Sequence, residues 1–535
     1  MFKIKSSKKG SEPFFISIAR ILSIKRMKKG SDPFFVFLLS LLFISQLAMP
    51  SFALKPMKPE DVKRLKAEGK YDAMMQQWRD FTDRSKLHPF EPSQLITRAK
   101  HINEIEVVLR GDNLPNKPTT DLDGNGITDE RDALELGYEV VRAAQRYPFH
   151  APPSGDQKTI VIPVDFRDLH GDPSHGTSYW DTWLFSKGVT DTPSMRDYYA
   201  EVSRDVLNCI GTVADSGDNG GWFRIDRNAG NYYGFDNAPY LVSKAIDLAD
   251  PYIDFSQFDN DNDGVVDSLI VIAAGPADWY TFWPHAWELY EPKVCDGVTL
   301  SPYFLATEDS YCGTFAHEHG HAMGLPDLYD YDGSSYGVGI WCLMGYGCYC
   351  GDEKTPCHLN AFCKDELGWI TPIQITKNML DAAIIANPNA EQVYKVWWNG
   401  KHYTECFYVE NRQNQNYDSY LPGEGILIWH FDKWGNQEVD SKRICDLEEA
   451  DGRRDIDTMA NWGDNTDPFY FESGNSYFTD YTNPNAHRND GSPTGVRIIR
   501  ISPLGDPMYA TLIVKEPAVE DVEKVEGTPI SPKKP

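Results

Sequence analysis

The sequence predicts an α+β fold, in which strands and helices come first and a run of short strands follows. Residues 159–166 form an almost continuous apolar run, which predicts a buried strand. Apolar side chains recur at helical spacing over residues 195–207, and a second apolar run covers residues 268–274. A further helix is expected over residues 313–323. This order of elements is that of an α+β domain.

The later part of the chain has a different pattern. From about residue 376, short stretches alternate between apolar and polar residues, for example over 392–398 and 497–502. This pattern predicts a β-sandwich-like domain over residues 376–515. Residues 516–535 are rich in Glu, Val, Lys and Pro, and we expect them to form a disordered tail.

Size and charge limit the kinds of function that the chain can have. Its 535 residues exceed the usual size of one core, and a hydrophobic content of 41% can fill two or three domains. The formal net charge of -27 argues against a nucleic-acid-binding surface. This acidic charge suits a soluble exported protein whose carboxylates bind calcium. The protein is also expected to be a monomer.

The N-terminus has the features of a signal peptide. Basic residues lie between Lys25 and Lys29, an apolar stretch runs from Phe34 to Ala48, and small residues precede the bond after Ala53. The apolar run is too short for a comfortable membrane span, so we expect removal of residues 1–53 and no stable membrane anchor. Met27 is a second candidate start. The protein is therefore expected outside the cell or in a periplasm.

The segment from His317 to Asp327, HEHGHAMGLPD, is the strongest functional motif in the sequence. Residues four apart share one face of a helix, so His317 and His321 can bind one zinc ion with Glu318 beside it as general base. Zinc lowers the pKa of a bound water molecule to about 7, which suits attack on a peptide carbonyl. Gly324 can end the helix in a left-handed conformation and bring Asp327 back as third ligand. Asp330 is the reserve candidate.

A second stretch, from Gly339 to Tyr346, supports this interpretation. Met344 is expected in a tight turn beneath the zinc as an apolar floor. Tyr346 stands two residues later, where its hydroxyl could bind the metal or the developing oxyanion; ordinary packing is the alternative.

These motifs resemble those of the metzincin peptidases, and more closely their immune inhibitor A-like family, whose zinc motif ends in aspartate. Other stretches that resemble the family over roughly residues 155–515 are Asp259–Gly264, Trp283–His285, Gly368–Trp369, Glu410–Gln413 and Gly423–His430. The resemblance implies a secreted zinc endopeptidase with structural calcium, acting on protein or peptide substrates. It also implies His317, Glu318, His321 and Asp327 as site residues, and a substrate extended along an edge strand.

Residues 54–150 are charged and helix-prone, which predicts a propeptide ahead of a catalytic domain over residues 151–375. Helical spacing is clearest over residues 62–78 and 96–109. The propeptide contains a calcium-loop motif with oxygen ligands at positions 1, 3, 5 and 9, glycine at position 6 and a carboxylate at position 12. The ligands at positions 1, 3, 5 and 12 are Asp121, Asp123, Asn125 and Asp132. An Asx-rich turn is the alternative.

A second calcium loop is expected before the strand at 268–274. Its ligands repeat the same spacing around Gly264, but position 12 is Ile270, so the shell must be completed from elsewhere. These ligands are Asp259, Asp261, Asp263 and Asp267.

All ten cysteines lie beyond the signal segment, and an even number in an exported chain predicts disulfides. Their connectivity cannot be read from the sequence. Several crowd around Met344, between residues 342 and 363, where some should staple the lower part of the active-site cleft. A second zinc site is the alternative, but the spacing matches no common cysteine pattern.

Two rival functions remain. One is a catalytically inactive, calcium-stabilised secreted binding protein, against which the intact ligands and Glu318 argue. The other is a zinc peptidase of different architecture, with a glutamate on a later helix as third ligand. The aspartate at 327 and the methionine turn argue against it.

Overall fold

A computed structural model describes residues 53–82, 151–188, 193–386, 391–400 and 405–515. Four predictions fall outside these residues: the apolar signal segment, the helical pattern over residues 96–109, the calcium loop formed by Asp121, Asp123, Asn125 and Asp132, and the C-terminal tail. No helix of the described part is long and apolar enough to cross a membrane.

A seven-stranded sheet forms the framework of the first part of the chain. Its central strands β2, β3, β4, β5 and β7 run parallel, whereas β6 runs antiparallel to β7. The short strand β1 pairs with the outer side of β6. The bounds are β1 Ala53–Leu54, β2 Gly155–Phe166, β3 Leu207–Val213, β4 Phe223–Ile225, β5 Leu269–Ala273, β6 His285–Cys295 and β7 Val298–Thr307. The two strands predicted at 159–166 and 268–274 are thus confirmed as β2 and β5.

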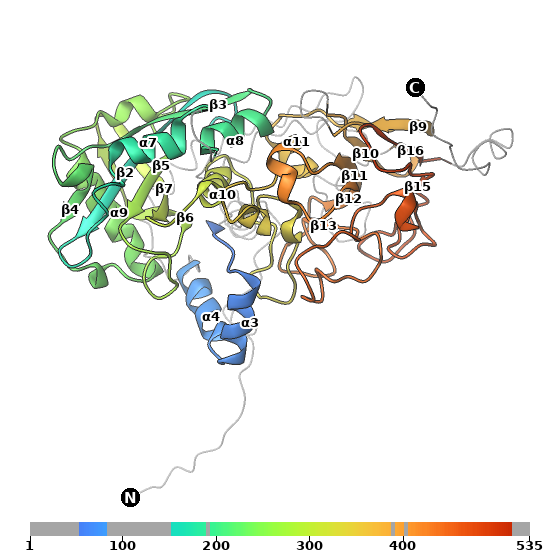
Figure 1. The fold of residues 1–535 in the computed structure, drawn as a ribbon, viewed down its shortest axis with the longest axis horizontal. Coiled ribbons are helices and arrows are strands. Elements are labelled where there is room, and N and C mark those ends of the chain that lie inside the picture. Colours follow the sequence, from blue (N-terminus) through green and yellow to red (C-terminus); the bar gives the residue numbers. More distant parts are fainter. Residues whose placement is uncertain (1–52, 83–150, 189–192, 387–390, 401–404, 516–535) are drawn as a thin grey trace, which may run out of the picture. The chain divides into compact units, whose positions relative to one another are not determined.

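Helices cover both faces of this sheet (Figure 1). Side chains alternate along a strand, so Val161 of β2 packs with one hydrophobic cluster and its neighbours Ile160 and Ile162 pack with another. The first cluster contains residues of α7, α8 and α10, and the second contains residues of α9. The bounds are α7 Thr177–Phe185, α8 Met195–Val202, α9 Ala238–Ala249 and α10 Cys312–Ala322.

The helix predicted over 195–207 is shorter than expected. It ends at Val202, and Leu207 already begins β3. Arg204 and Asp205 both adopt positive φ, 61° and 57°, which a helix does not tolerate and which turns the chain into the strand. Apolar spacing alone could not show this turn.

The predicted helical pattern over 62–78 is divided between two helices, α3 (Pro59–Ala67) and α4 (Tyr71–Thr82). Gly69, at φ 67°, makes the turn between them. Tyr71 contacts the loop after α10, where an added Cβ on Gly333 would meet its hydroxyl at 2.6 Å. The two helices therefore pack onto the domain that contains the metal-ligand motif.

The later strands form a five-stranded sheet, in the order β13-β12-β11-β10-β8, and a four-stranded sheet, in the order β14-β15-β16-β9. Their bounds are β8 Ile373–Gln374, β9 Met379–Ile384, β10 Tyr394–Val396, β11 Glu405–Arg412, β12 Gly425–Asp432, β13 Cys445–Leu447, β14 Tyr477–Thr479, β15 Arg497–Ile499 and β16 Met508–Ile513. One hydrophobic cluster joins these sheets to the α10 face of the first sheet. Trp341 also donates from Nε1 to Asp467 Oδ2 at 2.9 Å.

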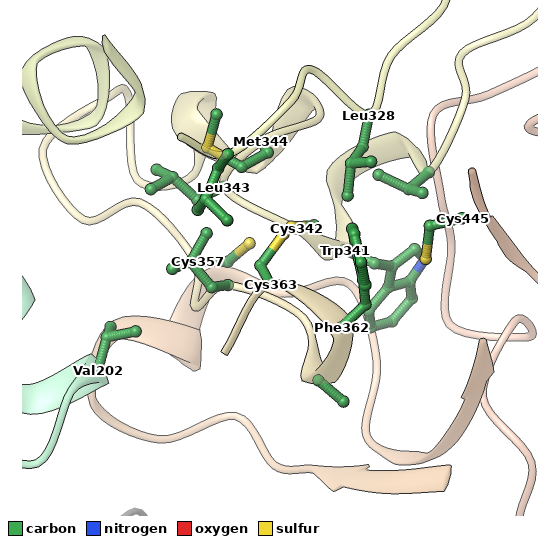
Figure 2. Packing of buried hydrophobic residues seen from close by; sticks show 14 of the residues in the cluster. Val202, Leu328, Trp341, Cys342, Leu343, Met344, Cys357, Phe362, Cys363 and Cys445 are labelled. Carbon is green, nitrogen blue, oxygen red and sulfur yellow. The ribbon is translucent and has the colours of Figure 1, made fainter. Parts of the chain in front are cut away.

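The segment between α10 and the later sheets contains short 3₁₀ turns, η5 (Gly339–Trp341) and η6 (Tyr346–Tyr349), and the helix α11 (Ala361–Glu366). Figure 2 shows its core, where Leu343 and Met344 lie near the buried cysteines 342, 357 and 363. All ten cysteines have free thiols in this structure. The Cys342 and Cys363 thiols are hydrogen-bonded to each other, as are those of Cys350 and Cys357.

Candidate metal centre

The helix α10 carries the HExxH motif and is buried along its whole length. Its last residue is Ala322, Met323 is the C-cap, and Gly324 follows at φ 91°, a left-handed conformation that glycine adopts without strain. The amide of Gly324 donates to the carbonyl of His321 at 2.8 Å, and that of Leu325 to Gly320 at 3.1 Å. This glycine-ended turn reverses the chain and brings Asp327 back beside the helix.

Three predicted metal ligands converge at this turn. Asp327 Oδ1 lies 3.0 Å from His317 Nε2 and 3.2 Å from His321 Nε2, and the two Nε2 atoms are 3.2 Å apart. The opposite ring nitrogens are engaged, because His317 Nδ1 donates to the Leu343 carbonyl at 2.9 Å and His321 Nδ1 to the Leu325 carbonyl at 2.7 Å. This tautomer directs both Nε2 lone pairs toward one point.

The chemistry of the cluster fits a divalent cation. His317, Glu318 and His321 are fully buried, and Asp327 is 5% exposed. Neither carboxylate oxygen of Glu318 has a hydrogen-bond partner among the described residues, and burial raises its pKa to about 8. Burial opposes ionisation of Asp327 too, but His321 and His317 hold its pKa at about 2. Two imidazoles with one carboxylate are ligands that zinc prefers.

Asp330, the reserve ligand, lies elsewhere. Its carboxylate accepts hydrogen bonds from the amides of Asp332, Ser334 and Ser335, at 3.0, 3.1 and 2.9 Å. Its ligand-type neighbours are Asp332 and Glu438, not the histidines of α10. The geometry therefore favours Asp327 as the third ligand.

Two tyrosines beside the ligand cluster, Tyr329 and Tyr331, were not predicted from the sequence. Tyr331 donates its hydroxyl hydrogen to Asp327 Oδ2, and the hydroxyl of Tyr329 is hydrogen-bonded to Tyr331. The ring of Tyr329 also lies 6.3 Å, between centroids, from that of His317. A hydroxyl bound to one oxygen of Asp327 orients the other oxygen toward the imidazoles. Nothing in the sequence separates these tyrosines from the others of this segment.

Met344 lies where the sequence predicts, beneath α10. A Cβ built on Gly320 would meet its Sδ at 2.7 Å, so the close approach requires glycine at this position of the helix. Tyr346 packs among other rings, 6.0 Å from Tyr329 and 5.3 Å from Tyr336 between centroids. These contacts favour its packing role, and its role toward the metal or an oxyanion stays a prediction.

Comparison with known proteins agrees with this geometry. Residues 174–370 match the family model of the immune inhibitor A peptidase M6 catalytic domain. This segment resembles that catalytic domain. The resemblance inferred from the motifs is confirmed, and the matched segment includes α10, the Gly324 turn and Met344.

Curated relatives extend the comparison beyond the family model. Pre-pro-metalloprotease PrtV from two strains of Vibrio cholerae serotype O1 is 28% identical over 296 residues, which cover 42% of this chain and 32% of PrtV. Immune inhibitor A of Bacillus thuringiensis subsp. alesti is 29% identical over 204 residues, 30% of this chain and 29% of that protein. The chain thus matches about a third of the length of these relatives. The family and the relatives' names support a metallopeptidase.

The middle histidine of the HEHGH motif, His319, has a structural role. It is not part of the ligand cluster. It is fully buried, and its Nε2 is hydrogen-bonded to Gln157 Oε1 of β2, while its Nδ1 lies 3.4 Å from Ser268 Oγ. It therefore ties the helix to the sheet.

The predicted second calcium loop gathers some of its ligands. Carboxylate oxygens of Asp259, Asp261 and Asp263 lie within 4.8 Å of one another. Asp267 is not in that group: its Oδ2 accepts from the Asn260 amide at 2.5 Å, and its buried Oδ1 lacks a partner among the described residues. Burial raises the pKa of Asp267 to about 7, and the nearby Asp261 and Asp263 add to the rise.

The choice between the two aspartates can be tested by metal binding. We expect Asp327→Asn to weaken zinc binding by on the order of 100-fold or more, because it removes an anionic ligand. Asp330→Asn should change the zinc Kd by less than about twofold. Competition with a chromogenic chelator measures both, with circular dichroism as the control for folding. The reverse order of effects would make Asp330 the third ligand.

Proposed function

We propose that this protein is a secreted zinc endopeptidase that hydrolyses peptide bonds of protein substrates. The observation that carries the proposal is the buried cluster of His317, His321 and Asp327, with the unpartnered carboxylate of Glu318 one residue from the first ligand. Such a cluster of ionisable groups is costly to bury without a cation. The matched peptidase family supports the same reaction class.

Zinc would be held by the Nε2 atoms of His317 and His321 and by the carboxylate of Asp327. When bound, it would supply a Lewis acid for the peptide carbonyl and for the attacking water. The carbonyls of Leu343 and Leu325 hold the imidazoles in the tautomer that leaves Nε2 unprotonated. Tyr331 orients Asp327 through its hydrogen bond.

Glu318 is the proposed general base. Its carboxylate would take a proton from the attacking water and pass it to the amine of the leaving product. Burial raises its pKa to about 8, whereas positive charge nearby, from His317 or a cation, favours the carboxylate. A group whose pKa lies near neutral pH can both accept and donate this proton.

We also propose that the N-terminal segment is a propeptide. Strand β1 pairs antiparallel with β6, which is the edge strand on that side once β1 is left out, and Leu54, the first residue expected after signal removal, lies opposite His285. An edge strand next to the zinc helix is where the metzincin pattern places an extended substrate. The segment thus occupies the backbone positions that a substrate would need, which supports a latent precursor.

The function is tested most directly by casein hydrolysis. We expect Glu318→Ala to lower kcat by about 10²–10⁴-fold while leaving the zinc Kd within severalfold, because it removes the base and no ligand. Glu472→Ala, an exposed acid far along the chain, is the control that should keep full activity.

If neither the wild type nor the variant cleaves casein although both bind zinc, a narrow specificity or persistent latency is indicated. If neither binds zinc, the rival function of an inactive, calcium-stabilised binding protein takes over.

We propose calcium at the loop of Asp259, Asp261 and Asp263, and at the loop outside the described residues. Calcium bound only by the folded state raises its stability, and we expect saturating calcium to raise Tm by about 2–4 °C or more. Asp261→Asn should reduce the shift, with Glu472→Gln as a control that keeps it. Differential scanning calorimetry against a chelator measures this, and an unchanged Tm would remove calcium from the proposal.

Export and maturation can be examined together on protein collected from the medium. We expect the secreted chain to begin at Leu54, after removal of the signal peptide. We also expect Cys342–Cys363 and Cys350–Cys357 as disulfides, because these thiols already lie side by side. Non-reducing peptide mapping measures both. Recovery of alkylated, unpaired forms of these four cysteines would contradict the pairing.

A further inference from the structure

In the N-terminal segment, Lys55 is held by hydrogen bonds from both its amide and its carbonyl. The Lys55 amide donates to the Pro284 carbonyl at 3.1 Å, and the Lys55 carbonyl accepts from Trp283 Nε1 at 2.8 Å. The next carbonyl, of Pro56, accepts from the Tyr349 hydroxyl. Lys55 is therefore bound as an extended peptide is bound, by main-chain hydrogen bonds with its side chain free to be recognised.

The side chain of Lys55 enters a buried acidic pocket. Its Nζ lies 2.8 Å from Glu353 Oε2, and the two side chains are only 7% and 11% exposed. The same ammonium lies 5.2 Å from the centroid of the Tyr349 ring, within the range of a cation–π contact. A carboxylate and an aromatic face together recognise a basic side chain.

The acid is held in place from the zinc helix. Thr314 Oγ1 donates to Glu353 Oε2 at 2.9 Å, and the Gly313 amide donates to the Glu353 carbonyl at 2.6 Å. Thr314 and Glu318 are four residues apart on α10 and so share one face. The acidic pocket is thus one helical turn from the proposed general base.

A second basic residue of the segment contributes less. Lys58 Nζ lies 3.8 Å from Glu353 Oε1, and its side chain is 42% exposed. Solvent screens such a pair, so the buried Lys55 contributes most of the interaction with Glu353.

Release of the segment would leave a buried carboxylate without its cation, which is unfavourable unless another cation replaces it. We propose that Glu353, with Tyr349 and Thr314, forms a substrate subsite that takes a Lys or Arg side chain at one fixed position from the cut bond. This inference rests on the proposed peptidase function, and it names the class of peptide that the cleft prefers.

The first test is cleavage-site profiling on a denatured proteome with secreted wild type, Glu353→Gln and Asp352→Asn. Asp352 is the matched control, because it is an exposed neighbouring acid that contacts neither lysine in the described structure. We expect basic residues to be enriched about tenfold at one position by wild type and Asp352→Asn, and not by Glu353→Gln. On synthetic peptides, Glu353→Gln should lower kcat/KM about tenfold for the basic peptide and less than about twofold for a neutral one.

Cleavage by wild type without a basic preference would overturn the subsite and leave the peptidase function standing. Absence of any cleavage would count against the peptidase function, and a binding experiment then decides on the subsite. The labelled peptide Ala-Leu-Lys-Pro-Met-Lys, which copies residues 53–58, is titrated into the full chain carrying Lys55→Ala. Replacing its first lysine by methionine should weaken binding about tenfold, and equal affinities would overturn the subsite.

Discussion

The burial of ionisable groups on one helix is the constraint on which the rest of the site depends. The helix α10 places His317, Glu318 and His321 out of contact with solvent, and the Gly324 turn adds Asp327. Each of these groups needs a partner, because an uncompensated charge in a protein interior costs several kcal/mol. Backbone carbonyls supply partners for the Nδ1 atoms, but the Nε2 atoms and the Asp327 carboxylate converge on one another, and the Glu318 carboxylate has no partner among the described residues. A divalent cation would satisfy this arrangement better than any hydrogen bond between these groups. In the proposed peptidase, burial would then be an advantage, since a low dielectric would strengthen the attraction between the cation and a substrate carbonyl.

The same buried helix dictates how closely its surroundings approach. A Cβ on Gly313 would come within 1.9 Å of the Cys348 carbonyl oxygen, and one on Gly320 would meet Met344 Sδ at 2.7 Å. These two glycines let the chain between Cys342 and Glu353 lie directly on α10. Met344 consequently packs against α10, and Glu353 reaches the first turn of the helix. The cysteines that crowd this segment lie in its core. Disulfides between them would fix the positions of Met344 and Glu353.

What could be predicted from the sequence was the local chemistry. The ligand cluster follows from spacing within eleven residues, since helical periodicity and one glycine turn fix the relative positions of His317, His321 and Asp327. Helix lengths were less certain, because the positive φ values that end α8 leave no trace in apolar spacing. Contacts between distant segments could not be predicted: Lys55 and Glu353 are separated by 298 residues, and the Tyr331 hydroxyl finds Asp327 only once the loop has folded. A local sequence pattern predicts the helices, the strands and the candidate metal ligands. The residues that orient a ligand, such as Tyr331, or that bind a side chain, such as Glu353, depend on tertiary packing.

In the proposed precursor, the segment around Lys55 connects latency with specificity in one set of contacts. Because it is joined covalently to the domain, its effective concentration at the cleft is high, and a free peptide with the same contacts competes poorly with it. Breaking the Lys55–Glu353 contact alone would therefore weaken the block without removing it, since β1 pairing and the packing of α3 and α4 persist. Cutting the chain changes this balance, because the segment then dissociates as a separate molecule at low concentration. If Glu353 forms the proposed subsite, the contacts that would keep the precursor closed are the ones that a basic substrate would use after cleavage. The sequence of the proposed propeptide would then match the substrate preference of the mature enzyme.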